Sequence, residues 1–209
     1  DNINQAQINT KSGVTFDSAL RSILRQDPDI IMVGEVRDEE TVELGIRAAL
    51  TGHLVFSTIH TNDAASGFTR LLNWDVEPFL IASTVKGILA QRLVRRICNE
   101  CKESYSPNEN ELEMIGLDKD DPIEAYKGKG CLACRNTGFK GRIGIYELLL
   151  MDGEISELVL NQEPGYKIRE QARANGMTTL LEDGLIKIKR GDTTISEVYE
   201  TLGTSKIVL

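Results

Sequence analysis

The 209-residue sequence has little of several features that would point to particular classes of protein. It contains no apolar run near the ~18 residues that are needed to span a bilayer, and its first residues lack the basic start and apolar stretch of a signal peptide. Aromatic residues make up only 5% of the chain and its net charge is −8, which argues against nucleic acid as a partner. These absences, with 41% hydrophobic and 27% charged residues, predict a soluble, cytosolic, globular protein.

Cysteine is also scarce, but its spacing is informative. Cys98 and Cys101 form one Cys-x-x-Cys pair, Cys131 and Cys134 form a second, and 29 residues separate the pairs. Each pair presents two sulfur atoms from one tight turn, so together they can supply four thiolates to a tetrahedral Zn²⁺. Two disulfides or four unrelated buried thiols are the alternatives, although disulfides are rare in cytosolic proteins. The pattern predicts a structural zinc, because four thiolates leave no open position for a reacting water.

The first third of the chain alternates helical and strand patterns. Apolar residues at helical spacing predict helices at 15–26, 39–50 and 64–73. Between them, Ile30–Val33 and Leu54–Ser57 are apolar runs of the kind that form strands buried on both faces. This alternation is typical of a parallel α/β sheet, in which chemistry collects at the carboxyl ends of the strands.

Polar residues follow both predicted strands. Glu35 comes two residues after the first, the Walker B position of nucleotide hydrolases, where a carboxylate is held beside Mg²⁺ or the attacking water. The alternative is a solvated loop glutamate favoured by the dipole of the next helix. His60 follows the second strand and can contact a phosphate oxygen, or it can be a histidine with a structural hydrogen bond. The other histidine, His53, precedes that strand.

The later part of the chain predicts one strand and several short helices. Residues 142–148 follow a glycine-rich stretch and are expected to return to the sheet as a strand. After it, apolar spacing predicts helices at 154–161, 164–174, 179–189 and 194–202. The last two are expected to begin with capping boxes, Thr179-x-x-Glu182 and Thr194-x-x-Glu197. Glycines stand where helices should end, at Gly176, Gly191 and Gly203.

Several stretches together carry a family signature, among them Gly-Glu-Val-Arg-Asp at 34–38 and Thr-Gly-His-Leu-Val-Phe-Ser-Thr-Ile-His at 51–60. The full set comprises residues 5–9, 15–16, 20–29, 34–41, 51–64 and 90–101. These residues closely resemble the GspE/PilB-like secretion ATPases, which serve type II secretion and type IV pilus assembly. The tetracysteine segment is similar to that of the assembly branch, because pilus retraction ATPases generally lack it.

The resemblance implies a RecA-like P-loop NTPase fold with a partial sheet, a small four-cysteine zinc subdomain and a helical C-terminal region. Residues 1–95 would be the C-terminal part of the ATPase core, 96–141 the zinc subdomain, and 142–209 the returning strand and helical region. By the same likeness Glu35 would be the Walker B glutamate. His53 and His60 would be the residues of the histidine box, with His60 contacting the γ-phosphate. The role of Arg37, in the same turn as the glutamate, stays open.

The resemblance also implies a homo-hexameric motor that uses ATP and Mg²⁺ to drive pilin or pseudopilin assembly through an inner-membrane platform protein. Such a motor would be cytoplasmic and would meet the inner face of the cytoplasmic membrane only through partners. The sequence does not separate type II secretion motors from type IV pilus or competence motors.

One family motif has no counterpart in these 209 residues. The Walker A loop, G-x-x-x-x-G-K-[ST], does not occur, and Gly128-Lys129-Gly130 has neither its spacing nor its Ser/Thr. Because Walker A amides and lysine hold much of Mg-ATP, this chain alone is expected neither to bind ATP tightly nor to hydrolyse it. It is also expected to leave an apolar sheet face to be covered. The alternative function is a non-catalytic, zinc-containing interaction module of the same machinery.

Overall fold

The computed structural model describes residues 3–118, 120 and 123–203, which form two compact units. Unit 1 consists of the chain up to Ile88 together with Leu150–Gln171, and unit 2 of Leu89–Leu149 together with the chain from Ala172 onward. The predicted division at residues 95 and 141 stays a prediction, and parts of it fall on residues outside the described ones. Among the described residues, no helix is long and apolar enough to cross a membrane.

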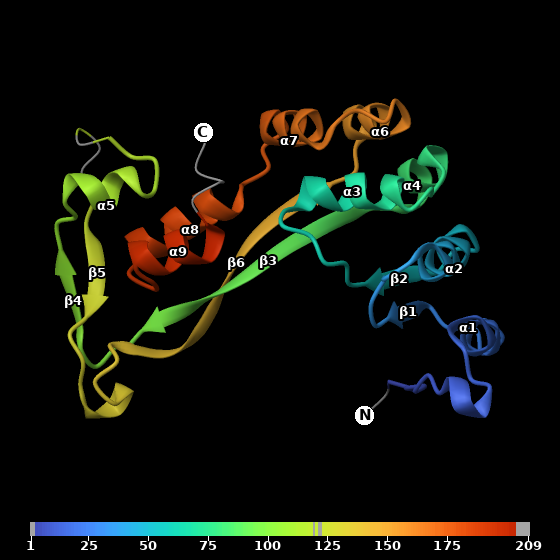
Figure 1. Ribbon diagram of the computed structural model, residues 1–209, viewed down its shortest axis with the longest axis horizontal. Helices are drawn as coiled ribbons and strands as arrows, with labels where there is room; N and C mark the ends of the chain where they lie inside the picture. Colours follow the sequence, from blue (N-terminus) through green and yellow to red (C-terminus); the bar gives the residue numbers. More distant parts are fainter. Residues whose placement is uncertain (1–2, 119, 121–122, 204–209) are drawn as a thin grey trace. The chain divides into compact units, whose positions relative to one another are not determined.

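Unit 1 is built around a parallel pair of short strands (Figure 1). β1 (Ile30–Val33) pairs in register with β2 (Leu54–Ser57), so that Ile30 faces Leu54 and Val33 faces Ser57. The helices of this unit are η1 (Thr10–Ser12), α1 (Phe16–Leu24), α2 (Glu39–Leu50), α3 (Ala64–Asn73), α4 (Pro78–Thr84), α6 (Gly153–Leu160) and most of α7 (Gly165–Ala174). The predicted strands and the predicted helices in this unit are confirmed, with ends that differ by two residues or fewer.

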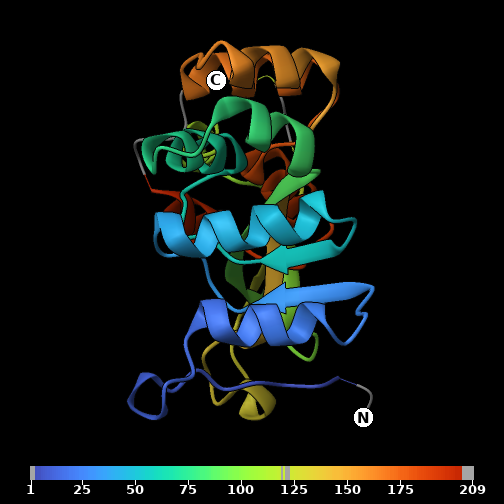
Figure 2. The same ribbon diagram turned by 90° about the vertical axis from the view of Figure 1, so that its right-hand side faces the viewer.

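Helices cover one face of this small sheet. α1 and α2 lie on the same side of the strands (Figures 1 and 2), and their apolar side chains pack there against Ile31 and Val33. On the other face, Ile30 is 60% and Met32 72% exposed among the described residues. The prediction of strands buried on both faces is therefore wrong, because alternate side chains point to opposite faces and the described helices cover only one. The expected uncovered apolar face is confirmed.

Unit 2 contains two further strand pairs. β3 (Gly87–Ile97) pairs with β6 (Phe139–Leu150), and both strands belong to this unit except for Gly87, Ile88 and Leu150. β4 (Lys102–Tyr105) pairs antiparallel with β5 (Ala125–Gly128). α5 (Glu109–Glu113) lies at one end of the β4–β5 pair and η2 (Leu132–Cys134) near the other (Figure 1). The remaining helices are α8 (Leu180–Lys189) and α9 (Ile195–Leu202).

The strand predicted at 142–148 exists as part of β6, but its predicted return to the β1–β2 sheet is wrong. Its partner is β3, a strand that the sequence reasoning does not predict. β6 pairs with β3 because the lengths of the two strands match: its 12 residues find far more backbone hydrogen-bond partners on the 11 residues of β3 than on a four-residue strand.

The ends of the C-terminal helices follow local sequence rules, with one exception. Thr179 and Glu182 form the predicted capping box at the start of α8. Thr194 also caps α9 by accepting a bond from the Glu197 N–H, but the Glu197 carboxylate accepts bonds from Arg95 instead. The second capping box is thus only half formed. The three expected glycine stops are confirmed by their positive φ angles, at Gly176, Gly191 and Gly203.

Candidate functional site

Glu35 lies in the loop that follows β1. Its carboxylate accepts a hydrogen bond from Arg37 Nε at 2.6 Å, and its other oxygen is 2.9 Å from His60 Nε2. The side chain of Glu35 is 20% exposed, whereas those of Arg37 and His60 are 76% and 86% exposed. The hydrogen bond from Arg37, aided by the neighbouring His60, lowers the pKa of Glu35 below its ordinary value. At neutral pH this group is therefore an ionised hydrogen-bond acceptor.

Two hydrogen bonds join the loops that follow the two strands. Val36 donates its N–H to Thr58 O at 2.8 Å, and the Thr58 hydroxyl donates to Gly34 O at 2.8 Å. Because β1 and β2 are parallel, their carboxyl ends meet at the same edge of the sheet. The predicted site residues Glu35 and His60 are brought together at this edge.

A hollow of about 370 Å³ lies beside Glu35. Its lining residues are Phe16, Gly34, Glu35, Arg37, Asp38 and Thr41. Asp38 accepts bonds from the N–H and hydroxyl of Thr41 at 2.9 and 2.7 Å, which lower its pKa and cap the start of α2. The hollow thus presents two ionised carboxylates, whose free lone pairs can orient water or a hydrated cation. The guanidinium of Arg37 and the N-terminus of α2 beside them favour an anion.

His53 is not part of this arrangement. It lies just before β2, at the end of the strand opposite to His60. Its Nδ1 is 3.0 Å from both Ala48 O and the Thr51 hydroxyl, at the end of α2. The structure therefore does not bring His53 to Glu35, and its place in a catalytic histidine box stays a prediction.

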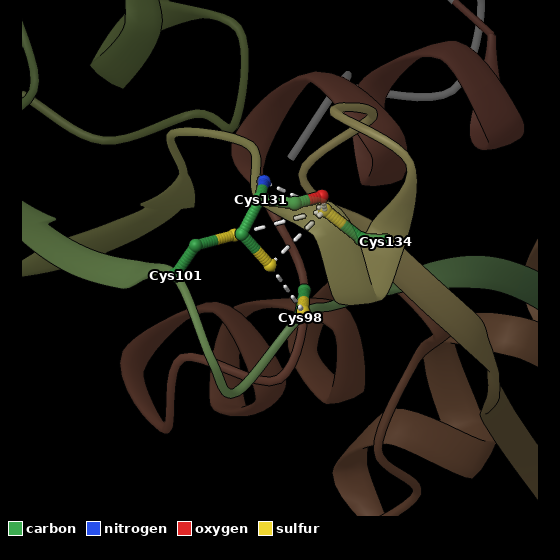
Figure 3. A group of neighbouring side chains, drawn as sticks. All are labelled: Cys98, Cys101, Cys131 and Cys134. Atoms are coloured by element: carbon green, nitrogen blue, oxygen red, sulfur yellow. Dashed lines mark hydrogen bonds between the residues drawn. The ribbon is translucent and has the colours of Figure 1, made fainter.

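The four cysteines converge in unit 2, and their sulfur atoms point toward one another (Figure 3). All four sulfurs lie within 4.8 Å of one another, with 3.9 Å for Cys98–Cys131 and Cys101–Cys134 and 3.7 Å for Cys131–Cys134. A tetrahedron of thiolates at the usual Zn–S length has edges of about 3.8 Å. A disulfide needs about 2 Å, and all four cysteines are free. The donor set and spacing thus fit a tetrahedral metal such as Zn²⁺.

Backbone contacts, in addition to the thiol groups, hold the two turns together. The N–H of Cys98 donates to Gly138 O at 2.9 Å, and the N–H of Lys129 donates to Cys101 O at 3.1 Å. Gly128 packs so tightly on Gly138 that an added Cβ would lie 2.1 Å from the Gly138 oxygen. Glycine is therefore required at 128. The pairing of β4 with β5 places the two cysteine turns, which adjoin the ends of these strands, next to each other.

The thiols differ in how readily they lose a proton. Burial raises the pKa of Cys101 to about 12, with a smaller contribution from the neighbouring thiols. Burial also acts on Cys134, but backbone N–H groups of Cys131 and Gly138 outweigh it and lower its pKa to about 6. Cys134 thus becomes a thiolate more readily than Cys101, and a metal that binds both sulfurs must displace the proton of Cys101.

Sequence reasoning misses one buried ion pair next to the site. Asp63 follows His60 by three residues, is 5% exposed, and pairs with Arg169 of α7. The two residues are 106 positions apart, so no local pattern connects them. Co-variation between related sequences is the signal that would find such a pair.

Comparison with known proteins agrees with this picture. The family model described as "Type II/IV secretion system protein" matches residues 1–200. The type IV pilus assembly ATPase PilB of Thermus thermophilus is 52% identical over 198 residues, which are 94% of this chain and 22% of that protein. Type II secretion system protein E of Pseudomonas aeruginosa is 45% identical over 198 residues, which are 95% of this chain and 39% of that protein.

Solved structures give the same fold. The pilus retraction motor PilT, solved with bound ADP, has a TM-score of 0.64 and 28% identity over 93% of this chain and 45% of that chain. The ATPase DotB of Legionella pneumophila has a TM-score of 0.61 and 23% identity over 93% of this chain and 44% of that chain, which speaks for the fold alone. The predicted α/β fold of the secretion ATPases is confirmed.

Proposed function

We propose, because this chain belongs to the type II/IV secretion system protein family, that it is part of an ATP-hydrolysing motor that drives pilin or pseudopilin assembly. The chain spans 22% and 39% of the lengths of the two relatives described above, so the proposed activity is that of a longer protein. The observation that carries the proposal is the contact between Glu35 and His60 where the parallel strands end.

In the proposed reaction Glu35 is the Walker B glutamate. A carboxylate with a lowered pKa is a good hydrogen-bond acceptor but a weak base, so its role is to orient the attacking water or the hydration shell of Mg²⁺ rather than to remove a proton. Arg37 holds this carboxylate in place. The imidazole of His60, which is largely exposed beside Glu35, would donate a hydrogen bond to a phosphate oxygen of the bound nucleotide. ATP supplies the phosphoanhydride bond and Mg²⁺ neutralises charge on its phosphates.

His53 is kept as the second residue of the histidine box. The contacts of its ring with Ala48 and Thr51 support a role in joining α2 to β2. The four cysteines are proposed to hold a structural Zn²⁺, as their spacing and free thiols support.

The remaining proposals concern the complete motor. We propose that the complete motor is a homo-hexamer whose partner is an inner-membrane platform protein and that it does not bind nucleic acid. It would be cytoplasmic and would meet the membrane only through its partners. The names of the relatives, a type IV pilus assembly ATPase and a type II secretion system protein, support the pilus or secretion role of such a motor.

A chimera tests the catalytic proposal. In the Thermus thermophilus PilB, the matched segment is replaced by residues 1–209 of this chain, and ATP hydrolysis is measured by phosphate release. We expect activity that falls at least about 10²-fold with Glu35→Gln. The matched control is Glu43→Gln, which alters an exposed carboxylate on α2 and should leave the rate unchanged.

The 209-residue chain alone should show no hydrolysis, since it contains no G-x-x-x-x-G-K-[ST] sequence. A folded chimera without activity would favour the alternative, a non-catalytic zinc-containing interaction module. A Glu35→Gln chimera at full rate would refute the role given to that residue.

A further inference from the structure

The loop between β2 and α3 carries His60 and is anchored on both sides of it. On the near side, Thr58 bonds to Gly34 and Val36 at 2.8 Å in each case. On the far side, Asp63 accepts the Ser66 N–H at 2.8 Å and so caps α3. Because the ring of His60 is itself largely exposed, its place depends on how the loop backbone is held.

The anchor at Asp63 is a buried charge with a distant partner. The Asp63 side chain is 8% exposed, and a carboxylate so buried is costly unless a counter-charge pairs with it. The guanidinium of Arg169 supplies that charge from α7. Its Nε is buried without a hydrogen-bond partner among the described residues, a cost that the fold tolerates while the terminal nitrogen reaches Asp63.

Packing, rather than the reach of a flexible side chain, brings Arg169 to Asp63. Its neighbour Ile168 is fully buried, which fixes the rotation of this part of α7. At the start of α7, a Cβ added to Gly165 would lie 2.9 Å from the Thr69 hydroxyl of α3. The start of α7 thus contacts the helix that Asp63 caps.

We propose that Arg169 is a positioning residue for His60. By pairing with Asp63 it fixes the loop three residues beyond His60, and this keeps the imidazole against Glu35. The catalytic meaning of that contact rests on the proposed function, whereas the contact itself does not. A helix more than 100 residues further along the chain thereby sets the geometry of the site.

The test uses NMR of the histidine ring signals in the 209-residue chain, which has only two histidines. Glu35→Gln removes the carboxylate partner and defines the reference displacement of the His60 signal. Arg169→Gln should move the His60 signal in the same direction by at least half of that displacement. The His53 signal, held by Ala48 and Thr51, should stay in place.

Two further variants separate the ion pair from general folding. Asp63→Asn removes the charge but keeps a good helix cap, so it should reproduce the effect even if Arg169→Gln does not fold. Arg169→Lys keeps the charge and should restore part of the signal position. Lys167→Gln is the matched control, because it alters an exposed cation on the same helix and should move neither signal.

An unmoved His60 signal in folded Arg169→Gln and Asp63→Asn would overturn the proposal. So would equal displacement of both histidine signals, which indicates general loosening of the unit. Because the readout needs no ATP, an inactive chimera would refute the nucleotide proposal and leave this result unaffected.

Discussion

Removal of the metal from the four-cysteine cluster should strongly destabilise unit 2. A metal bound by all four sulfurs would close a loop, since 29 residues separate Cys101 from Cys131. A cross-link around a loop of about 30 residues contributes about 4 kcal/mol through the entropy of the unfolded chain. For a unit of about 100 residues this corresponds to a fall of about 15–30 °C in melting temperature.

The contacts around the cluster explain why the loss should reach beyond the cysteine turns. Lys102 on β4 lies over the Tyr126 ring of β5 and donates to Arg190 O at the end of α8. Loosening of the β4–β5 pair therefore weakens the contact that holds the end of α8.

The assay is elemental mass spectrometry of the purified chain, followed by thermal melting with and without a chelator. We expect about one zinc per chain and a melting transition that falls on chelation. Cys134→Ser should reproduce the fall. Leu132→Ser, which alters a 94% exposed residue in the same turn, should not. Zinc-free protein with an unchanged melt would refute the reasoning and leave four buried thiols as the interpretation.

Two further substitutions probe unit 2, each measured by urea unfolding. Glu197→Gln removes the partner of the Arg95 backbone and guanidinium and should cost about 1–2 kcal/mol at neutral pH. The hydrogen bond from Arg95 lowers the pKa of Glu197. The difference in unfolding free energy between the two proteins should therefore be complete above pH ~4.5 and shrink as the pH falls further. A difference that is independent of pH would contradict this prediction. Thr179→Ala removes the cap of α8 and should cost about 1 kcal/mol, whereas no loss would mean that the cap is replaced by water.

Local pattern was enough to locate most of the elements. β1 and β2 occupy the predicted residues because short apolar runs that are bounded by turns are typical of strands and too short for most helices. β3 escapes prediction because Gln91, Arg92 and Arg95 stand between its apolar residues and obscure the strand pattern. β3 can be recognised as a strand only once its pairing with β6 is known.

The candidate site was predictable where its residues follow a strand or share a turn. Glu35 and His60 each stand just beyond an apolar strand, and parallel pairing alone brings such positions together. His53 is also a histidine near β2, but it precedes the strand. A histidine beside a strand therefore indicates a site only when it follows the carboxyl end of that strand. The four-cysteine cluster was predictable from the two Cys-x-x-Cys turns.

The sequence by itself determined α1–α3 and α6–α9, the two parallel strands, the four-cysteine set and the resemblance to secretion ATPases. Only the tertiary structure decided that residues 142–148 pair with β3, that Glu197 turns from its own helix to Arg95, and that Asp63 is held by Arg169. The physical reason is the range of the interactions involved. Periodicity, capping and turns depend on neighbours within a few residues, whereas pairings across about 100 residues depend on how whole elements pack.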